Sequence, residues 1–496
     1  MNASASVHRI RRLNWSAWLP LGLALLAFAV RVAGLTAQSL WRDEVDALMF
    51  ATRPLPELLN MFRRPGDNGP LFFLALRPWL AAAGPSEFSL RFPSAVLGTL
   101  AVPLCYALVA RLTDRRVALL TALLLALAPY HTWYSQEAKM YAALTVLVPA
   151  SLLLTIEATR RGGLWRWALL YIVTSLSFYT HLLAALIVPV QVIWLALLPA
   201  AGRRRRWLTI AGYLAVLCLP YLPLAAWQAG MWLGTFETGH PFVPLGDILR
   251  VLAAVFSLGV LAGREWLVLL PYMLALVAGT ILWAWQGERR ARLRTVALLL
   301  TWLLLPPLMV FGVSLGMPIF TERYLIWCLP AFLTLLALGI TALAHLWRPV
   351  GLVTLLVVLA LNLFSVAQQA ARPIKSDFRA AAAYVRQQMQ PGELLVYQIP
   401  YIRYTFTYYY DPQHDPRATS AAWLDGPYTN RGMTEPEVDA WMAQGLANVS
   451  AAWLIASEVP MWDARGLTEK WLAAQGTVTA HQEFSRVAVT RYELKP

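Results

Sequence analysis

Two acidic clusters in the sequence could carry acid–base chemistry. Asp43 and Glu44 stand in the run WRDEVD at residues 41–46, directly after an apolar segment, and Glu137 stands in the run YSQEAKMY at residues 134–141, between two further apolar segments. Carboxylates from two separate loops suit a general base and a group that orients it. An acidic pair is often only the solvated start of a loop. The loop around Glu137, however, is too short to leave a membrane surface, and ionisable residues at that depth are usually functional.

Basic and aromatic residues are predicted on the same side as these acids. Arg323 and Tyr324 open an apolar segment, Lys139 follows Glu137 by two residues, and His181 closes another apolar segment. An arginine at a helix end often serves only to place its charge among the lipid headgroups, but a guanidinium also binds phosphate oxygens bidentately. A histidine in such a place is more often structural than catalytic. The sequence contains no metal-site spacing, P-loop or serine nucleophile elbow.

The elements that would position these residues are membrane helices. Of the 496 residues, 58% are hydrophobic and only 14% are charged, whereas an ordinary soluble protein carries about 25% charged residues. A helix needs roughly 20 apolar residues to cross a bilayer. Runs of that size predict eleven spans, at about 14–36, 88–110, 117–134, 141–158, 165–182, 183–199, 207–226, 266–285, 296–315, 324–345 and 350–368. A shorter, charged run at 247–262 is predicted to lie on or dip into the surface.

The distribution of arginines predicts the orientation. With eleven spans, one set of loops holds 18 basic residues and three acidic ones, while the opposite set, up to residue 366, holds as many acidic as basic residues. Because Lys and Arg concentrate in cytoplasmic loops, we expect a cytoplasmic N-terminus and extracytoplasmic acidic clusters. The net charge of +14 is then explained by membrane orientation, and we expect no nucleic-acid partner.

The predicted fold class is an all-α polytopic membrane protein with a small C-terminal soluble α/β domain. The membrane domain is predicted over residues 1–370, with a long first outer loop at 37–87, and the α/β domain over residues 371–496. In the α/β domain the pattern predicts helices at 376–390 and 465–474 and strands at 393–399, 451–456 and 486–494. An odd number of spans makes this domain extracytoplasmic. Three cysteines, all inside apolar runs, exclude a disulfide framework.

Six motifs, in order and on the expected loops, resemble the GT-C superfamily of glycosyltransferases that use polyprenyl-phosphate sugars. The sequence is most similar to the bacterial relatives of protein O-mannosyltransferases and the lipid A aminoarabinose transferase. The motifs are WRDE at 41–44, GPLFF at 69–73, SEFSLRFPS at 86–94, YSQEAKMY at 134–141, YTH at 179–181 and ERY at 322–324. The resemblance covers about residues 10–370. It implies an inverting transfer of a sugar, a hexose such as mannose, from a polyprenyl-phosphate donor to an acceptor hydroxyl on the extracytoplasmic side.

The resemblance also implies roles for individual residues. Asp43 matches the catalytic general base, Glu44 would assist it, and Glu137 matches the second acidic position. The residues expected near the donor phosphate are Arg323, Tyr324 and Lys139. Further candidates are His181, Asp67, Asn68 and Tyr141.

The resemblance leaves some features open. Asn68 stands where relatives often have a histidine, so it is open what replaces the imidazole. Two acids facing a phosphate could hold a divalent cation such as Mg²⁺ or Mn²⁺, and the sequence does not commit to one. The acceptor could be a protein, a lipid or another glycan.

Two other functions are weighed against the glycosyltransferase. One is a transporter or flippase for a lipid-linked or anionic substrate, and the other is a receptor or scaffold that presents the C-terminal domain. Transporters place ionisable residues near mid-bilayer on broken helices, often in repeated halves. In this sequence the acids crowd one face and no inverted repeat is detected, which favours the glycosyltransferase.

Overall fold

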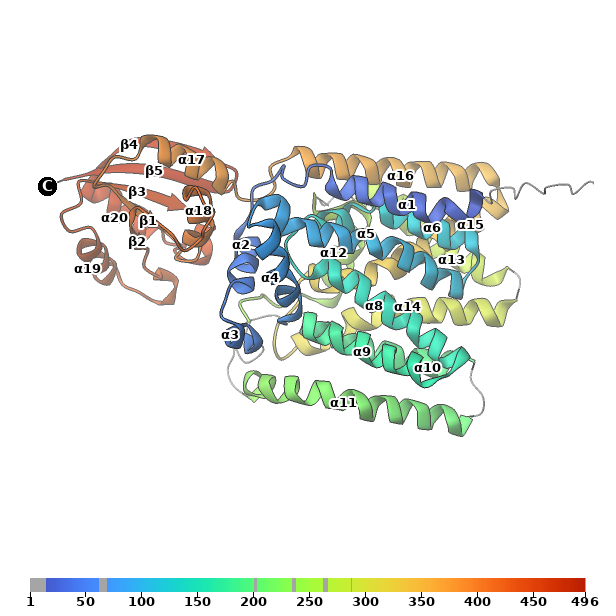
Figure 1. Ribbon diagram of the computed structural model, residues 1–496. Coiled ribbons are helices and arrows are strands. Elements are labelled where there is room, and N and C mark those ends of the chain that lie inside the picture. Colours follow the sequence, from blue (N-terminus) through green and yellow to red (C-terminus); the bar gives the residue numbers. More distant parts are fainter. Residues whose placement is uncertain are drawn as a thin grey trace, which may run out of the picture.

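The computed structural model describes residues 15–61, 69–199, 203–233, 238–261, 266–286 and 288–495. A bundle of helices ends against a smaller unit of helices and strands, and the three short helices of the first loop lie at the junction (Figure 1). Among the described residues, seven helices are long and apolar enough to cross a membrane, or eight if one bent pair forms a single span. The protein is therefore a multi-pass membrane protein, and the predicted number of eleven spans is not confirmed.

Most predicted spans correspond to a helix of the bundle. These helices are α1 (Trp15–Val32), α5 (Glu87–Leu112), α6 (Arg115–Ala126), α7 (Pro129–Ser135), α8 (Tyr141–Arg161), α9 (Leu164–Thr180), α10 (Ile187–Leu197), α11 (Arg203–Leu233), α13 (Trp266–Trp285), α14 (Arg289–Ser314), α15 (Leu329–Leu346) and α16 (Arg348–Ala371). Two 3₁₀ helices, η2 (Leu182–Leu186) and η4 (Glu322–Cys328), precede α10 and α15. In α15 all but the last residues are buried, so this helix lies at the centre of the bundle.

The predicted span 117–134 is not one straight helix. It is broken between α6 and α7, which are bent by 57°. Pro129 begins α7 and has no N–H to donate to the carbonyl of Leu125. The Arg31 guanidinium, at the end of α1, replaces the lost donors: it bonds to the carbonyls of Leu125 at 3.1 Å and Ala126 at 3.0 Å, and to Nδ1 of His131 at 2.6 Å.

The first loop contains α2 (Arg42–Ala51), α3 (Leu55–Leu59) and α4 (Leu71–Ala83). Helix α2 begins after Trp41, whose extended backbone lets its N–H donate to the Glu44 carboxylate at 3.4 Å. Acidic residues in this first turn also suit the positive end of the helix dipole. The predicted amphipathic piece from Leu55 coincides with α3.

Helix α12 (Leu245–Leu258) corresponds to the predicted surface run at 247–262. Its 14 residues give a length of about 21 Å, which is too short to cross a bilayer. One face, with Ile248, Leu252 and Phe256, is buried against α7, α13, α14 and α16. The helix therefore packs against the bundle, and by its length it is not a span on its own.

The C-terminal unit is built on a five-stranded mixed sheet. Its strands are β1 (Leu394–Tyr397), β2 (Ala422–Asp425), β3 (Ala451–Ala456), β4 (Gly476–Phe484) and β5 (Val487–Leu494), in the order β2-β1-β3-β5-β4. Strands β2, β1 and β3 are parallel, whereas β5 and β4 are antiparallel to their neighbours. The helices are α17 (Phe378–Gln388), α18 (Ile402–Tyr410), α19 (Glu435–Gly445) and α20 (Leu467–Gln475). The predicted fold class, a polytopic helical protein with a small C-terminal α/β domain, is confirmed.

Candidate active site

Asp43 lies in the first turn of α2. This helix stands at the end of the bundle that faces the α/β domain (Figure 1). Oδ2 of Asp43 is 3.7 Å from Nη2 of Arg323, and its Oδ1 is 3.6 Å from Nη2 of Arg42. The side chain is 13% exposed. Burial acts to raise the pKa of Asp43, but the positive charges of Lys139, Arg323 and Arg42 outweigh it, so the pKa lies below the ordinary value. Asp43 is thus an ionised carboxylate at neutral pH.

Glu44 is fully buried and fully hydrogen-bonded. Its Oε1 accepts from Nε of Arg91 at 2.7 Å and from the backbone N–H of Ala138 at 3.1 Å, while its Oε2 accepts from Nη2 of Arg91 and Nζ of Lys375, each at 2.8 Å. Burial acts to raise the pKa of Glu44, but Arg91 and Lys375 together lower it to about 2. Because both oxygens already face protein donors, the structure places Glu44 as an anchor of α2. This placement differs from the expected role in assisting the base at the substrate.

Glu137, between α7 and α8, is also fully buried, but its surroundings are different. Neither carboxylate oxygen has a hydrogen-bond partner among the described residues. The pKa of Glu137 is raised to about 7, and burial is the main cause. The charge of Lys375 acts to lower it, while the charges of Glu44 and Asp43 act in the same direction as burial. Glu137 can therefore exchange a proton near neutral pH, and its oxygens are available to a ligand.

The cations and rings expected around a phosphate lie beside these acids. The Arg323 guanidinium is 5.7 Å from the ring centroid of Trp41 and 6.0 Å from those of Tyr141 and Tyr324. The ring centroids of Tyr324 and His181 are 4.8 Å apart. Within the described part of the chain, Nε of Arg323 and Nε2 of His181 are buried without a hydrogen-bond partner. These atoms, like the Glu137 oxygens, are polar groups that a bound substrate could satisfy.

Lys139 is a further positively charged residue of the site. Its residue is 5% exposed, its Nζ lies 5.9 Å from the ring centroids of both Phe50 and Phe73, and its charge acts on Asp43. The structure thus brings together the predicted residues Asp43, Glu137, Lys139, Tyr141, His181, Arg323 and Tyr324. The predicted candidates Asp67 and Asn68 lie outside the described residues.

The described residues do not fit a resident divalent cation. No three Asp, Glu, His or Cys side chains among them converge in a way that could hold a metal ion. Asp43 is faced by Arg323, Arg42 and Lys139, and such positive neighbours oppose a second cation. We therefore derive no step through Mg²⁺ or Mn²⁺.

Three charged residues of the site were not singled out from the sequence. Arg91 is a charged residue inside an otherwise apolar helix and is 1% exposed, which is a signal in itself. Lys375 is one of only four lysines in the chain. Arg42, whose guanidinium lies 4.6 Å from the Tyr401 ring centroid and 3.9 Å from Glu458, links α2 to the α/β domain. The two residues of the α/β domain that Arg42 contacts, Tyr401 and Glu458, cannot be recognised from the local sequence around Arg42.

Comparison with known proteins shows which family model and which solved structures the chain is similar to. The model of the family described as dolichyl-phosphate-mannose-protein mannosyltransferase matches residues 67–227. No curated protein matches the chain in sequence. The structure is similar to apo ArnT from Cupriavidus metallidurans, with a TM-score of 0.62 and 14% identity, covering 96% of this chain and 98% of that one. It is also similar to the oligosaccharyltransferase of Archaeoglobus fulgidus, with a TM-score of 0.56 and 13% identity, covering 98% of this chain and 74% of that one.

These similarities confirm the resemblance that the motifs indicated. The chain shares its fold with ArnT and with the archaeal oligosaccharyltransferase, and its residues 67–227 match the mannosyltransferase family model. The same ArnT has also been solved with bound undecaprenyl phosphate, and this structure gives a TM-score of 0.60 at 14% identity.

Proposed function

We propose that the protein is a membrane glycosyltransferase that moves a sugar from a polyprenyl-phosphate donor to an acceptor hydroxyl. The observation that carries this proposal is the placement of an ionised carboxylate, Asp43, within 3.7 Å of the Arg323 guanidinium. A base and a phosphate-binding cation at the same point are what such a transfer needs. We place the reaction on the extracytoplasmic side, where the arginine distribution puts the first loop and the α/β domain.

In the proposed mechanism Asp43 accepts the proton of the acceptor hydroxyl. The acceptor oxygen forms a bond to the anomeric carbon as the bond from that carbon to the phosphate oxygen breaks, so the configuration inverts in a single step. Arg323 and Lys139 stabilise the negative charge that grows on the departing lipid phosphate. Tyr324 and Tyr141 flank Arg323 and would complete the phosphate pocket.

In this mechanism the ion pair between Asp43 and Arg323 couples donor binding to the basicity of Asp43. While Arg323 faces Asp43, its charge helps to keep the pKa of that carboxylate low. When a donor phosphate draws Arg323 toward itself, this lowering weakens and Asp43 becomes a stronger base. Glu137, with two unpartnered oxygens, would accept hydrogen bonds from hydroxyl groups of the donor sugar or the acceptor and so orient them.

The comparisons support the class of donor. The family description names dolichyl-phosphate mannose, ArnT was solved with undecaprenyl phosphate, and the archaeal oligosaccharyltransferase with dolichol phosphate and an inhibitory peptide. A polyprenyl-phosphate hexose, with mannose as the first to be tested, is therefore the proposed donor. The acceptor is a hydroxyl group on a protein, a lipid or a glycan.

The test is donor consumption by the purified full-length protein. A panel of polyprenyl-phosphate sugars is offered in liposomes, and loss of the sugar is followed by mass spectrometry. We expect one donor to be consumed by the wild-type protein and Asp43→Asn to reduce consumption at least about 10³-fold, since it removes the base while keeping the shape. The matched control is Asp247→Asn, an exposed acid of α12 that pairs with Arg250, which should act like the wild type.

Two outcomes would count against the proposal. Wild-type consumption by the Asp43→Asn variant would exclude Asp43 as the base. Movement of a labelled polyprenyl-phosphate sugar across the bilayer without its consumption would favour the transporter or flippase.

A further inference from the structure

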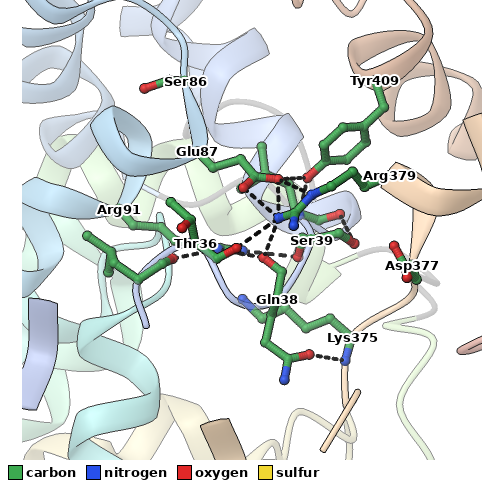
Figure 2. A network of polar contacts seen from close by, with 12 residues as sticks. Thr36, Gln38, Ser39, Ser86, Glu87, Arg91, Lys375, Asp377, Arg379 and Tyr409 are labelled. Atoms are coloured by element: carbon green, nitrogen blue, oxygen red, sulfur yellow. Dashed lines mark hydrogen bonds and ion pairs between the residues drawn. The ribbon is translucent and has the colours of Figure 1, made fainter. Parts of the chain in front are cut away.

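The linker between the bundle and the α/β domain is bound tightly to the segment that leads into α2. Residues 372–377 connect α16 to α17 and run beside residues 36–39 (Figure 2). The side-chain carbonyl of Gln38 accepts from the backbone N–H groups of Ile374 at 3.1 Å and Lys375 at 3.3 Å, and its amide donates to the Arg372 carbonyl at 2.6 Å. The Ser39 hydroxyl donates to the carbonyl of Ser376 at 2.6 Å. Four residues of the linker are thus fixed against the start of the first loop.

A second set of contacts holds the α/β domain to the same segment. Arg379 of α17 donates to both carboxylate oxygens of Glu87, at 2.7 and 2.6 Å, and to the carbonyl of Thr36 at 2.9 Å. The Tyr409 hydroxyl donates to Glu87 and accepts from the backbone N–H of Leu40 at 2.5 Å. Figure 2 shows these side chains converging from the bundle and from the α/β domain on one network. The position of the linker is therefore set by the folded domain as well as by its own bonds.

This arrangement carries the side chain of Lys375 into the candidate active site. Lys375 is 7% exposed, its Nζ is 2.8 Å from Oε2 of Glu44, and it lies 5.3 Å from the ring centroid of Trp133. Glu44 directly follows Asp43 in α2, so the lysine bonds to the helix turn that carries the proposed base. The two partners are 331 residues apart in the chain.

Lys375 also balances charge inside the site. The charged groups acting on Glu137 are Glu44 and Asp43 from α2, Arg323 from η4 and Lys375 from the linker; Tyr134 of α7 is a titratable neighbour. Arg323 is already paired with Asp43. Lys375 is the strongest of the charges that favour the ionised form of Glu137. Without it, Glu44 would keep Arg91 as its ion-pair partner, and Glu137 would keep only the weaker influence of Arg323.

We propose that Lys375 is a positioning residue of the transfer reaction, through which the linker of the α/β domain completes the active site. By bonding to Glu44 it fixes the first turn of α2 and therefore Asp43, and by its charge it allows Glu137 to ionise. The inference rests on the proposed function of Asp43 and adds a requirement for the α/β domain. It also explains why the domain is held to the first loop by two separate networks.

The experiment compares three single variants of the full-length protein in the donor-consumption assay. Lys375→Met removes the charge and keeps the length, Lys375→Arg keeps the charge, and Lys470→Met changes an exposed lysine of α20 as the control. We expect Lys375→Met to lower kcat at least about tenfold, since a small misplacement of a catalytic group is costly, with a KM for the donor within about threefold of the wild type. Lys375→Arg should recover most of kcat, and Lys470→Met should match the wild type.

The pH profile of kcat separates a role in charge balance from one in packing. Loss of a nearby cation raises the pKa of a carboxyl group, so the limb of the profile governed by Glu137 should move to higher pH in Lys375→Met. The variant should then regain activity as the pH is raised, and Lys375→Arg should restore the original profile. If kcat and the profile of Lys375→Met equal those of the wild type, or if Lys375→Arg is as impaired as Lys375→Met with an unchanged profile, the proposal is wrong.

A readout independent of activity keeps this inference distinct from the proposed function. Hydrogen exchange of the α2 amides should be at least about tenfold faster in Lys375→Met than in the wild type or in Lys470→Met, and equal exchange in all three would overturn the positioning role. If Asp43→Asn keeps wild-type transfer, the proposed function fails, and the exchange rates alone then decide whether Lys375 fixes α2. If Lys375→Met does not fold, Lys375→Gln, which keeps an N–H donor for Glu44 but no charge, takes its place: the pH profile should shift as for Lys375→Met while the exchange of α2 stays near that of the wild type, and an unshifted profile would overturn the charge role.

Discussion

Replacement of Arg91 by methionine should destabilise the protein more than any exposed substitution. Arg91 bonds to both oxygens of Glu44, at 2.7 and 2.8 Å, and to the carbonyls of Leu35, Gln38 and Ser39 at 2.8, 2.8 and 3.0 Å. Removing one partner of a buried ion pair costs about 3–5 kcal/mol because the other charge stays buried. Each carbonyl that loses its donor adds about 1 kcal/mol, unless water replaces the bond. We therefore expect Arg91→Met to lower the free energy of unfolding by at least about 3 kcal/mol.

The assay is an equilibrium unfolding titration in detergent micelles, with the loss of helix followed by circular dichroism. The matched control is Arg77→Met, which removes an exposed arginine of α4 that donates to the carbonyls of Ala51 and Arg53 and should cost at most about 1 kcal/mol. Arg91→Lys should fall between the two, because an ammonium keeps the charge but cannot match both carboxylate oxygens and three carbonyls. If Arg91→Met and Arg77→Met differ by less than about 1 kcal/mol, the buried pair does not hold the first loop in place, and the reasoning is refuted.

Two further predictions concern the substrate-facing residues. Arg323→Ala should raise the KM for the lipid donor at least about tenfold, because it removes a bidentate partner of the phosphate. Its cost in free energy of unfolding should be smaller than that of Arg91→Met, because Lys139 and Arg42 still face Asp43. A wild-type KM would return Arg323 to the role of an interfacial anchor. Glu137→Gln should stabilise the protein more at pH 8 than at pH 5. Burial raises the pKa of Glu137 in the folded protein from 4.5 to about 7, so between these pH values the folded wild type keeps a proton that the unfolded chain releases. The stability of the wild type therefore falls as the pH rises from about 4.5 to about 7, whereas that of the glutamine variant does not. Unfolding titrations of both proteins at the two pH values test this, and an equal effect at pH 5 and pH 8 would contradict it.

Features of the fold that depend on local sequence pattern were predicted well. Apolar runs of span length located most helices of the bundle, and alternation with turn residues placed β1, β3 and β5 within two residues of their ends. The bend between α6 and α7 was missed although Pro129 marks it, because the flanking run remains apolar throughout. Strands β2 and β4 were missed because β2 has only four residues and β4 is a mostly exposed edge strand, so neither shows a buried alternation. Helix α18 was missed because its run of tyrosines and threonines favours a strand.

The candidate site was predictable to the extent that its residues lie in recognisable motifs. Asp43, Glu137 and Arg323 could be named because each stands at the end of an apolar segment on the predicted outer side. The role of Glu44 was not accessible, because its partners Arg91 and Lys375 lie 47 and 331 residues away. Such tertiary pairs leave no periodic trace, and only the folded chain shows which of two adjacent acids is saturated by hydrogen bonds and which lies beside Arg323.

The arginine that spans the gap between α6 and α7 has a consequence for biogenesis. Arg31 belongs to α1, yet the carbonyls of Ala126 and Leu125 that it satisfies are made 95 and 94 residues later. Insertion of an arginine into a bilayer costs about 2.5–3.5 kcal/mol on translocon scales. We therefore expect α1 to be held firmly in the membrane only once α6 has been made and accepts its side chain. Assembly of this half of the membrane domain should then be cooperative between segments that are made early and late.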